Sequence, residues 1–205
     1  ARFLFHSAQH EEGLSRLSYV VDQQKGAGLL SGVYGCGKSL LADAIIQSLD
    51  KKRYQIGLVH TPCPSSLELL KLITYSLGHQ EVPAGRAEVQ VLLQRTLENN
   101  FKAGKRTVLI IDEAHTIHNT EAFEDLRLLL NYQADGKFLM TLLLLGQPEL
   151  REMIKLIKQF DQRIHLRYHL KALPLEEIAR YIQHRLAVGG ASKALFAEEA
   201  LALIA

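Results

Sequence analysis

Apolar and polar residues alternate along this chain in blocks that predict strands and helices in turn. After Ser7, a suitable helix N-cap, apolar residues recur at helical spacing. The run from Thr107 to Ile111, by contrast, is β-branched and apolar throughout, as in fully buried strands. The same criteria predict strands at 28–31, 54–60, 107–111, 138–145 and 164–170, and helices over 7–25, 40–49, 65–77, 86–102, 120–132, 148–160 (broken) and 174–188. Such alternation is typical of an α/β fold in which helices wrap a parallel sheet.

Composition places the chain among ordinary globular proteins. Of its 205 residues, 47% are hydrophobic and 22% charged, and the net charge of +2 gives no overall attraction to nucleic acid or to an anionic membrane. The longest apolar run, Leu139 to Leu145, is far shorter than the ~20 residues that span a bilayer. Two cysteines, Cys36 and Cys63, suit a reducing compartment. We therefore expect a soluble protein without a signal peptide and, because 198–205 resembles the middle of a helix, a fragment of a longer chain.

A glycine-rich segment matches the phosphate-binding pattern G-x-x-x-x-G-K-[ST] in full, as Gly32-Val33-Tyr34-Gly35-Cys36-Gly37-Lys38-Ser39. Glycines allow a loop tight enough to turn successive backbone N–H groups towards one phosphate, and the following helix aims its N-terminal dipole at the same anion. Lys38 would bring positive charge to the β- and γ-phosphates of ATP, and the Ser39 hydroxyl would ligate Mg²⁺. The alternative is a chance glycine turn, but a strand precedes the segment and a helix follows it, which is the context that the motif requires.

Two carboxylates, Asp112 and Glu113, follow the apolar strand at 107–111. Because ligands of open parallel sheets collect at the carboxyl edge, Asp112 would hold Mg²⁺, directly or through water, and Glu113 would orient and deprotonate the attacking water. Without the phosphate loop, two solvated acids would be the better interpretation. The stretch between Lys38 and Asp112 holds one strand with its helices, which leaves room for a strand inserted between the phosphate-loop strand and the acidic strand. That insertion, with a catalytic Glu beside the metal-binding Asp, characterises the additional-strand class of P-loop NTPases.

At these residues the chain resembles AAA+ ATPases and, more narrowly, the ExeA-type ATPase family (general secretion pathway protein A). The resemblance covers nearly the whole chain and includes Leu4-Phe5 with His10-Glu11-Glu12, the phosphate loop, Leu109-Ile110-Ile111-Asp112-Glu113-Ala114, Leu126-Arg127-Leu128-Leu129, Leu145-Gly146-Gln147-Pro148-Glu149-Leu150-Arg151, Gln162-Arg163-Ile164 and Tyr168-His169-Leu170. Gly-Gln-Pro-Glu-Leu is its most family-specific part. The resemblance implies a three-layer αβα P-loop NTPase core with a five-stranded parallel sheet over 1–172, followed by the beginning of a small helical lid over 173–205.

The family also implies roles for residues outside the two motifs. Gln147 would be a polar sensor of the γ-phosphate, although it could equally be a turn residue before Pro148. His10 would approach the adenine, and Leu40 would complete the nucleotide-binding residues together with the phosphate loop.

Arg163 lies just before the last strand, where AAA+ proteins place an arginine finger. Such a finger reaches the γ-phosphate bound by a neighbouring subunit, an effect worth about 10³-fold or more elsewhere. Arg151 and Arg167 compete for this role, and a plain surface arginine is the alternative. The segment 151–171 carries an excess of positive residues, which suits a neighbour's phosphates or a nucleic-acid backbone.

Three departures from the family pattern stand out. His115 follows Asp-Glu-Ala where the family usually has Gln or Asn, and His60-Thr61 replaces a polar switch residue, often Asn. Cys36 replaces a small polar residue in the phosphate loop. The loop amides and the helix dipole are expected to lower the pKa of the Cys36 thiol, so that alkylation there would block ATP binding.

The resemblance predicts an AAA+ ATPase that binds and hydrolyses Mg-ATP to drive assembly of a bacterial secretion or pilus apparatus through the cell envelope. Its expected partners are further copies of itself, in a nucleotide-dependent ring or filament, and a protein of the secretion apparatus. DNA stays open as a partner, and no membrane contact is expected from this segment. The expected location is the cytoplasm, as a free protein or as the cytoplasmic domain of an inner-membrane protein. The main alternative is a DNA-binding ATPase that assists transposition.

Two further interpretations are weaker. Asp112-Glu113-Ala114-His115 spells the box of DEAH-type helicases, but those enzymes need two motor domains and a Gln-Arg-x-Gly-Arg motif that this sequence lacks. A nucleotide-gated scaffold that barely turns over would not need the complete set of Lys38, Ser39, Asp112 and Glu113.

Overall fold

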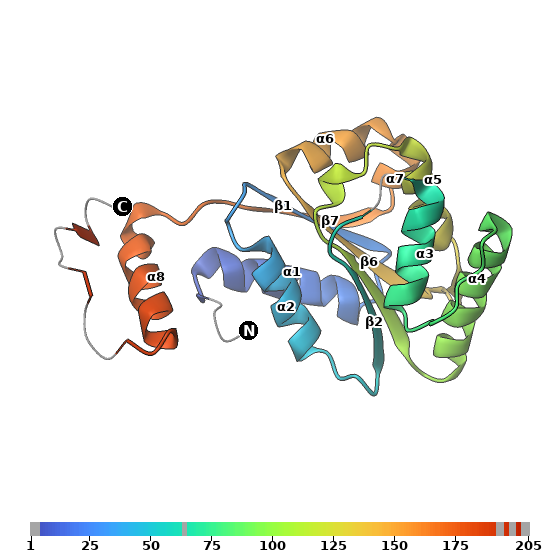
Figure 1. Ribbon diagram of the computed structural model, residues 1–205, viewed down its shortest axis with the longest axis horizontal. Helices are drawn as coiled ribbons and strands as arrows, with labels where there is room; N and C mark the ends of the chain where they lie inside the picture. The colour runs from blue at the N-terminus through green and yellow to red at the C-terminus, as the bar shows by residue number, and fades with distance from the viewer. Residues whose placement is uncertain (1–4, 63–64, 192–194, 197–199, 202–205) are drawn as a thin grey trace.

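Residues 5–62, 65–191, 195–196 and 200–201 are described by a computed structural model, in which one sheet of five parallel strands has the order β2-β3-β6-β1-β7 (Figure 1). These strands are β1 (Ala27–Gly32), β2 (Tyr54–Val59), β3 (Arg106–Ile111), β6 (Met140–Gly146) and β7 (Ile164–Leu170). The helices are α1 (Ala8–Asp22), α2 (Lys38–Ser48), α3 (Ser66–Ser76), α4 (Arg86–Lys102), α5 (Thr120–Leu129), α6 (Pro148–Leu156), α7 (Lys158–Asp161) and α8 (Leu175–Val188), with a 3₁₀ turn η1 (Ala114–Thr116). The predicted α/β fold with a five-stranded parallel sheet is confirmed.

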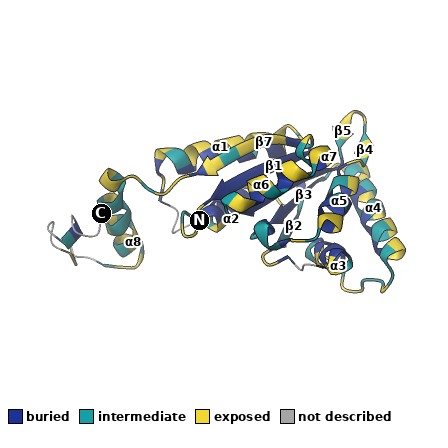
Figure 2. Cartoon of the chain, turned by 90° about the horizontal axis from the view of Figure 1, so that it is seen from above, coloured by how far each residue is buried: buried dark blue, intermediate teal, exposed yellow. Residues whose placement is uncertain are grey.

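Helices cover both faces of the sheet, which makes three layers (Figures 1 and 2). All seven residues of β6 are buried, because alternate side chains enter different cores. Leu143 and Leu145 belong to the core shared with α1 and α2. Leu142 and Leu144 belong to the larger core shared with α3 to α7. The uninterrupted apolar run of this strand therefore follows from its central place in the sheet.

The strand that separates β1 from β3 is β6. Leu142 pairs with Ala27 on one side and with Leu109 on the other. β2, the strand formed between the phosphate loop and the acidic pair along the chain, instead lies at the edge of the sheet. The expected inserted strand is present, but it is β6, which comes after β3 along the chain, and not β2. This crossover brings Gln147, directly after β6, to the carboxyl ends of the strands, where the phosphate loop and Asp112 also lie.

The strand predicted at 138–145 is divided in the structure. Phe138 belongs to a short antiparallel hairpin of β4 (Gln133–Ala134) and β5 (Lys137–Phe138), and β6 begins only at Met140. Asp135 and Gly136 connect the hairpin with φ values of 51° and 70°. Positive φ at both central residues is the type I′ turn that Asp-Gly favours. The prediction of one strand over 138–145, made from the continuous apolar run, is therefore wrong at its start, and the Asp-Gly pair is the feature of the sequence that indicates the hairpin.

Helix α8 follows β7 and lies apart from the sheet (Figure 1). None of its residues is buried. It is the described part of the segment 173–205 that the sequence assigns to a helical lid, and most of the helix predicted at 198–205 lies outside the described residues. No helix among the described residues is long and apolar enough to cross a membrane.

Candidate active site

The phosphate loop joins the carboxyl end of β1 to the first residue of α2, and three of its glycines are required by its shape. Gly35 and Gly37 have φ values of 76° and 99°, in the left-handed region that favours glycine. A Cβ on Gly32 would lie 2.5 Å from the carbonyl oxygen of Leu170 on the neighbouring strand. The loop is thus pressed against β7 at one end and turns into the amino terminus of α2 at the other, where backbone N–H groups can bind an anion.

Lys38 folds back over this loop. Its side chain is buried, and Nζ donates to the carbonyl oxygens of Gly32 at 2.9 Å and Val33 at 3.0 Å. An ammonium group carries three protons, so one remains for a phosphate oxygen. The loop therefore holds the lysine charge in place before any ligand arrives.

The two acids that follow β3 have different surroundings. Asp112 is buried; its Oδ2 accepts a hydrogen bond from the Ser39 hydroxyl at 2.5 Å, and its Oδ1 accepts one from the backbone N–H of Glu113 at 2.9 Å. Glu113 has a left-handed backbone, with φ of 51°, and its side chain is 37% exposed. The turn that Glu113 makes separates the carboxylates, so that Asp112 faces the loop and Glu113 keeps access to water.

The Ser39 and Asp112 oxygens fit the predicted Mg²⁺ ion. Mg²⁺ prefers hard oxygen ligands and is commonly held by one or two protein oxygens together with water and substrate phosphates. A hydroxyl and a carboxylate that already touch at the mouth of a phosphate loop supply such ligands. Both side chains are within reach of one ion, for which the Ser39 hydroxyl would turn its proton away from Asp112 and offer an oxygen lone pair.

Gln147 and His115 form a second cluster at the carboxyl ends of β6 and β3. Gln147 is the N-cap of α6, and Pro148 occupies the first helical turn, so the residue does stand in a turn. It makes no side-chain cap hydrogen bond. Its side-chain amide instead lies 3.1 Å from Nε2 of His115, and the same Nε2 lies 3.5 Å from Oε2 of Glu113. Nothing in the sequence pattern places His115 between these two residues.

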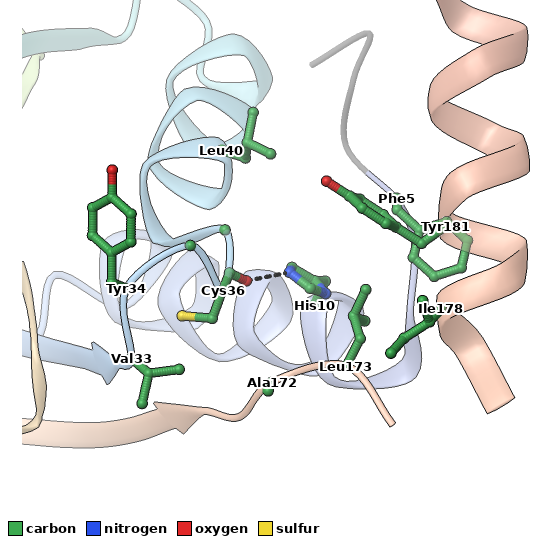
Figure 3. A pocket seen from close by; sticks show the side chains of 12 residues that line it. Phe5, His10, Val33, Tyr34, Cys36, Leu40, Ala172, Leu173, Ile178 and Tyr181 are labelled. Atoms are coloured by element: carbon green, nitrogen blue, oxygen red, sulfur yellow. Dashed lines mark hydrogen bonds between the residues drawn. The ribbon is translucent and has the colours of Figure 1, made fainter. Parts of the chain in front are cut away.

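A pocket of about 350 Å³ opens beside the phosphate loop (Figure 3). One wall is formed by the loop, by Leu40 of α2 and by His10 of α1, all of which were predicted from the sequence. The opposite wall is apolar and was not predicted; it consists of Phe5, Ala172, Leu173, Ile178 and Tyr181. Leu4-Phe5 belonged to the family resemblance and was the available signal for the first of these. The pocket is suited to a flat apolar group such as a nucleotide base.

His10 contacts the backbone of the phosphate loop. Its Nε2 lies 2.9 Å from the carbonyl oxygen of Cys36 (Figure 3). Its Nδ1 lies 2.6 Å from the Ser7 hydroxyl. A carbonyl only accepts, so Nε2 carries the proton, and Nδ1 of the neutral ring accepts from Ser7. His10 thus ties the amino terminus of α1 to the loop while also facing the pocket. Its predicted approach to adenine stays a prediction.

The expected lowering of the Cys36 pKa is wrong. Burial raises the pKa of the Cys36 thiol above its ordinary value of 9.0, and the nearby positive charge of Lys38 only partly opposes this. The sulfur lies inside the loop, where a Cβ on Gly32 would be 2.7 Å from Sγ. Loss of water around the thiolate therefore outweighs the favourable charges. Cys63 lies outside the described residues.

Arg163 lies at the amino end of β7, whereas the phosphate loop lies at the carboxyl ends of the strands. Ile164 pairs with Ala27 at the start of β1, whereas Leu170 pairs with Gly32 at its end. Strand residues advance by about 3.3 Å each, so roughly 20 Å separates Arg163 from the loop. Its guanidinium donates to Asn131 at 2.8 Å. Arg163 cannot reach a nucleotide bound to its own chain.

The two competing arginines are placed differently. Arg167 donates to the carboxylate of Asp161 at 2.6 Å and to the backbone carbonyl of Ile164 at 3.1 Å, so it is held within its own subunit. Arg151 is exposed on α6, after Gln147. Arg151 and Arg163 are both candidates for action on a neighbouring subunit.

A phosphate loop between β1 and α2, an acidic pair after β3 and a strand inserted between β1 and β3 together define an additional-strand P-loop nucleotide-binding domain. Residues 21–154 match the family described as "AAA domain", and the chain belongs to this family of P-loop ATPases. The predicted membership among AAA+ ATPases is therefore confirmed.

The chain is 34% identical over 205 residues to general secretion pathway protein A of Aeromonas hydrophila, in an alignment that covers 98% of this chain and 37% of that protein. The chain thus spans little more than a third of the relative's length. This similarity confirms the resemblance seen in the sequence.

Solved structures with the same fold include Cdc6p from Pyrobaculum aerophilum, with a TM-score of 0.74 and 15% identity over 98% of this chain and 55% of that chain. The ORC2 protein of Aeropyrum pernix, in its ADPNP-ADP complexes, has a TM-score of 0.69 and 19% identity over 87% of this chain and 50% of that chain. At these identities the likeness shows the fold alone.

Proposed function

We propose that this domain binds Mg-ATP and hydrolyses it. The observation that carries the proposal is the contact between Ser39 and Asp112 at the mouth of the phosphate loop, with Glu113 turned towards water beside it. Lys38 and the loop amides would bind the β- and γ-phosphates. Mg²⁺ held by Ser39 and Asp112 would offset the negative charge of the phosphate oxygens.

Glu113 would act as the general base. It would accept a proton from a water molecule whose oxygen bonds to the γ-phosphorus, while the bond from that phosphorus to the bridging oxygen breaks and ADP leaves with the electron pair. Its carboxylate is partly exposed and lies 3.5 Å from Nε2 of His115 through Oε2, which leaves Oε1 for water. Gln147 would donate its amide to a γ-phosphate oxygen.

Two substitutions test this proposal. Lys38→Ala should lose nucleotide binding, whereas Glu113→Gln should bind ATP normally and lose turnover by about 100-fold or more, the usual contribution of a positioned base. Glu149→Gln is the matched control, because this carboxylate is exposed on α6 and outside the proposed machinery. Equal nucleotide affinity in the wild type and in Lys38→Ala would contradict the assignment.

We infer that hydrolysis requires association of several copies. Arg163 is too far from its own phosphate loop to stabilise charge there, so a finger role at this position must be exerted on a neighbour. A ring or a filament in which each copy presents its Arg163 edge to the next would complete every site. The support is the geometry of one subunit together with the family resemblance.

For the process that hydrolysis drives, we favour assembly of a secretion or pilus apparatus through the bacterial cell envelope, by a domain that acts on the cytoplasmic side. The support is the similarity to general secretion pathway protein A. The alternative, a DNA-binding ATPase that assists transposition, is favoured by the positive residues of 151–171. Ion pairs reduce the charge available to DNA, because Lys155 pairs with Glu152 and Arg167 with Asp161.

DNA distinguishes the two processes. If duplex DNA does not change the hydrolysis rate between low and moderate salt, the secretion role is supported. Stimulation that falls steeply with salt would show phosphate contacts and favour the transposition role.

A further inference from the structure

His115 lies between the tips of the two central strands that carry the proposed base and the proposed sensor. It is the middle residue of η1, directly after the acidic pair, and its side chain is 17% exposed. A Cβ on Gly146, the last residue of β6, would lie 3.2 Å from the His115 backbone nitrogen and 3.3 Å from its Nδ1. The imidazole therefore packs directly against the backbone of β6, in a place that the glycine keeps open.

The hydrogen bonds around this ring fix its proton. The backbone N–H of Gln147 donates to Nδ1 of His115 at 3.4 Å. A backbone N–H cannot accept, so Nδ1 is unprotonated and the proton of the neutral ring is on Nε2. Nε2 therefore acts as a donor towards the side chains around it.

That single proton has two acceptors in reach. The amide nitrogen position of Gln147 lies 3.1 Å from Nε2 and becomes an acceptor when the amide oxygen and nitrogen are exchanged, and Oε2 of Glu113 lies 3.5 Å from Nε2. Amide oxygen and nitrogen are assigned from their partners, so the donor at Nε2 places the amide oxygen of Gln147 against the ring. The NH₂ group of Gln147 is then left to donate elsewhere.

We propose that His115 is a positioning residue that couples Gln147 to Glu113. The inference rests on the proposed ATP hydrolysis. When the Gln147 amide turns to a γ-phosphate, Nε2–H loses that acceptor and donates to Oε2 of Glu113. This leaves Oε1 of the base for the proton of the attacking water. Without a γ-phosphate, Nε2–H of His115 stays hydrogen-bonded to the Gln147 amide oxygen, and Glu113 is not held.

Three substitutions at this position separate the two contacts. His115→Ala removes both. An Asn amide lies near the position of Nδ1, so His115→Asn keeps an acceptor for the Gln147 backbone but cannot reach Glu113. A Gln amide reaches the position of Nε2, so His115→Gln keeps a donor for Glu113. His118→Ala, at an exposed histidine three residues further on, is the matched control.

We expect His115→Ala and His115→Asn to lower kcat by about 10- to 100-fold, within the contribution of a positioned base, while His115→Gln and His118→Ala stay within about threefold of the wild type. The affinity for ADP should be unchanged in all four variants, because ADP offers no γ-phosphate to Gln147. In a Gln147→Ala background, His115→Ala should no longer change the preference for an ATP analogue over ADP, because no amide is left for the ring to hold.

A binding measurement keeps this inference separate from hydrolysis. In the wild type, a non-hydrolysable ATP analogue should bind more tightly than ADP. Gln147→Ala should reduce that ratio, whereas His115→Ala should raise it, because Gln147 then reaches the γ-phosphate without first leaving the imidazole ring. This result would support the coupling even in a wild-type protein without turnover, which would overturn only the proposed function. An unchanged or lowered ratio in His115→Ala, a parallel change of ADP affinity, or additive effects of the two substitutions on the ratio would overturn the coupling.

Discussion

The hydroxyl of Ser39 donates to Asp112 across 2.5 Å, although 73 residues separate the two positions along the chain. Ser39 belongs to the first turn of α2, which follows β1, and Asp112 follows β3. In the sheet, β6 lies between β1 and β3. The contact therefore depends on the correct order of three strands. It also sets the position of a divalent ion, because both oxygens face the mouth of the phosphate loop.

Ser39→Ala should separate metal binding from nucleotide binding. We expect the gain in ATP affinity on adding Mg²⁺ to fall by about tenfold or more, the loss seen when even the partners of metal ligands are removed. The affinity measured in EDTA should stay the same, because Lys38 and the loop amides are intact. Ser48→Ala, at the other end of α2, is the control. Titration of a fluorescent ATP analogue with and without Mg²⁺ decides the matter, and an equal loss in both conditions would argue against the metal role.

Two glycines of the phosphate loop should respond differently to alanine. Both have positive φ, which costs about 1–2 kcal/mol for a residue with a Cβ. The Cβ of Gly35→Ala would meet nothing within 4 Å, but that of Gly37→Ala would lie 2.8 Å from Nε2 of His10. Gly37→Ala should therefore lose more free energy of unfolding in urea than Gly35→Ala, and the two changes should cost the same when both are made in a His10→Ala background. Equal losses in the two single variants would show that His10 does not press on the loop.

Cys36 should react slowly with iodoacetamide near pH 7. Because burial raises its pKa above 9.0, the fraction of thiolate is below that of an ordinary cysteine at this pH and increases only as the pH rises past 9. Bound ATP should slow the reaction further, and alkylated protein should not bind ATP. Peptide mass spectrometry distinguishes Cys36 from Cys63. Fast labelling at pH 7 would contradict the raised pKa, and labelling indifferent to ATP would place the thiol away from the ligand.

Arg163→Ala should bind ATP normally and hydrolyse it poorly, while wild-type specific activity should rise with protein concentration. Mixing Arg163→Ala with Glu113→Gln should restore part of the activity, because one kind of mixed interface joins an intact Glu113 to a neighbour's intact Arg163. Arg151→Ala, treated in the same way, tests the competing arginine. A rate that is independent of concentration, together with full activity of Arg163→Ala, would eliminate the finger role.

The phosphate loop and the acidic pair could be recognised from the sequence because their chemistry is encoded in short spacings. Gly32 to Ser39 form one loop, and Asp112-Glu113 follow the end of one strand. Recognising either motif does not require the order of the strands. The order of the strands could not be read in this way. β2, β3 and β6 are all compatible with burial, and only the crossover after β3 decides which of them lies beside β1.

Contacts between distant residues account for the other differences. The pKa of Cys36 was misjudged because local charges were visible in the sequence, whereas the packing against Gly32 that removes water was not. His115 was noticed only as a departure from the family pattern. Its position between Glu113 and Gln147 depends on η1 meeting the end of β6, which a sequence does not show.

Helix α8 buries none of its own residues, yet it supplies Ile178 and Tyr181 to the pocket beside the phosphate loop. Phe5 meets the ring of Tyr181 edge-on, with the ring centres 5.8 Å apart. A purine in this pocket would pack between α8 and the phosphate loop and would bury apolar surface on both. Nucleotide binding would then resemble the last step of folding, with the negative change in heat capacity that follows burial of apolar surface. ADP carries the same base as ATP, so α8 would stay docked after the γ-phosphate has gone and would be released only with the base.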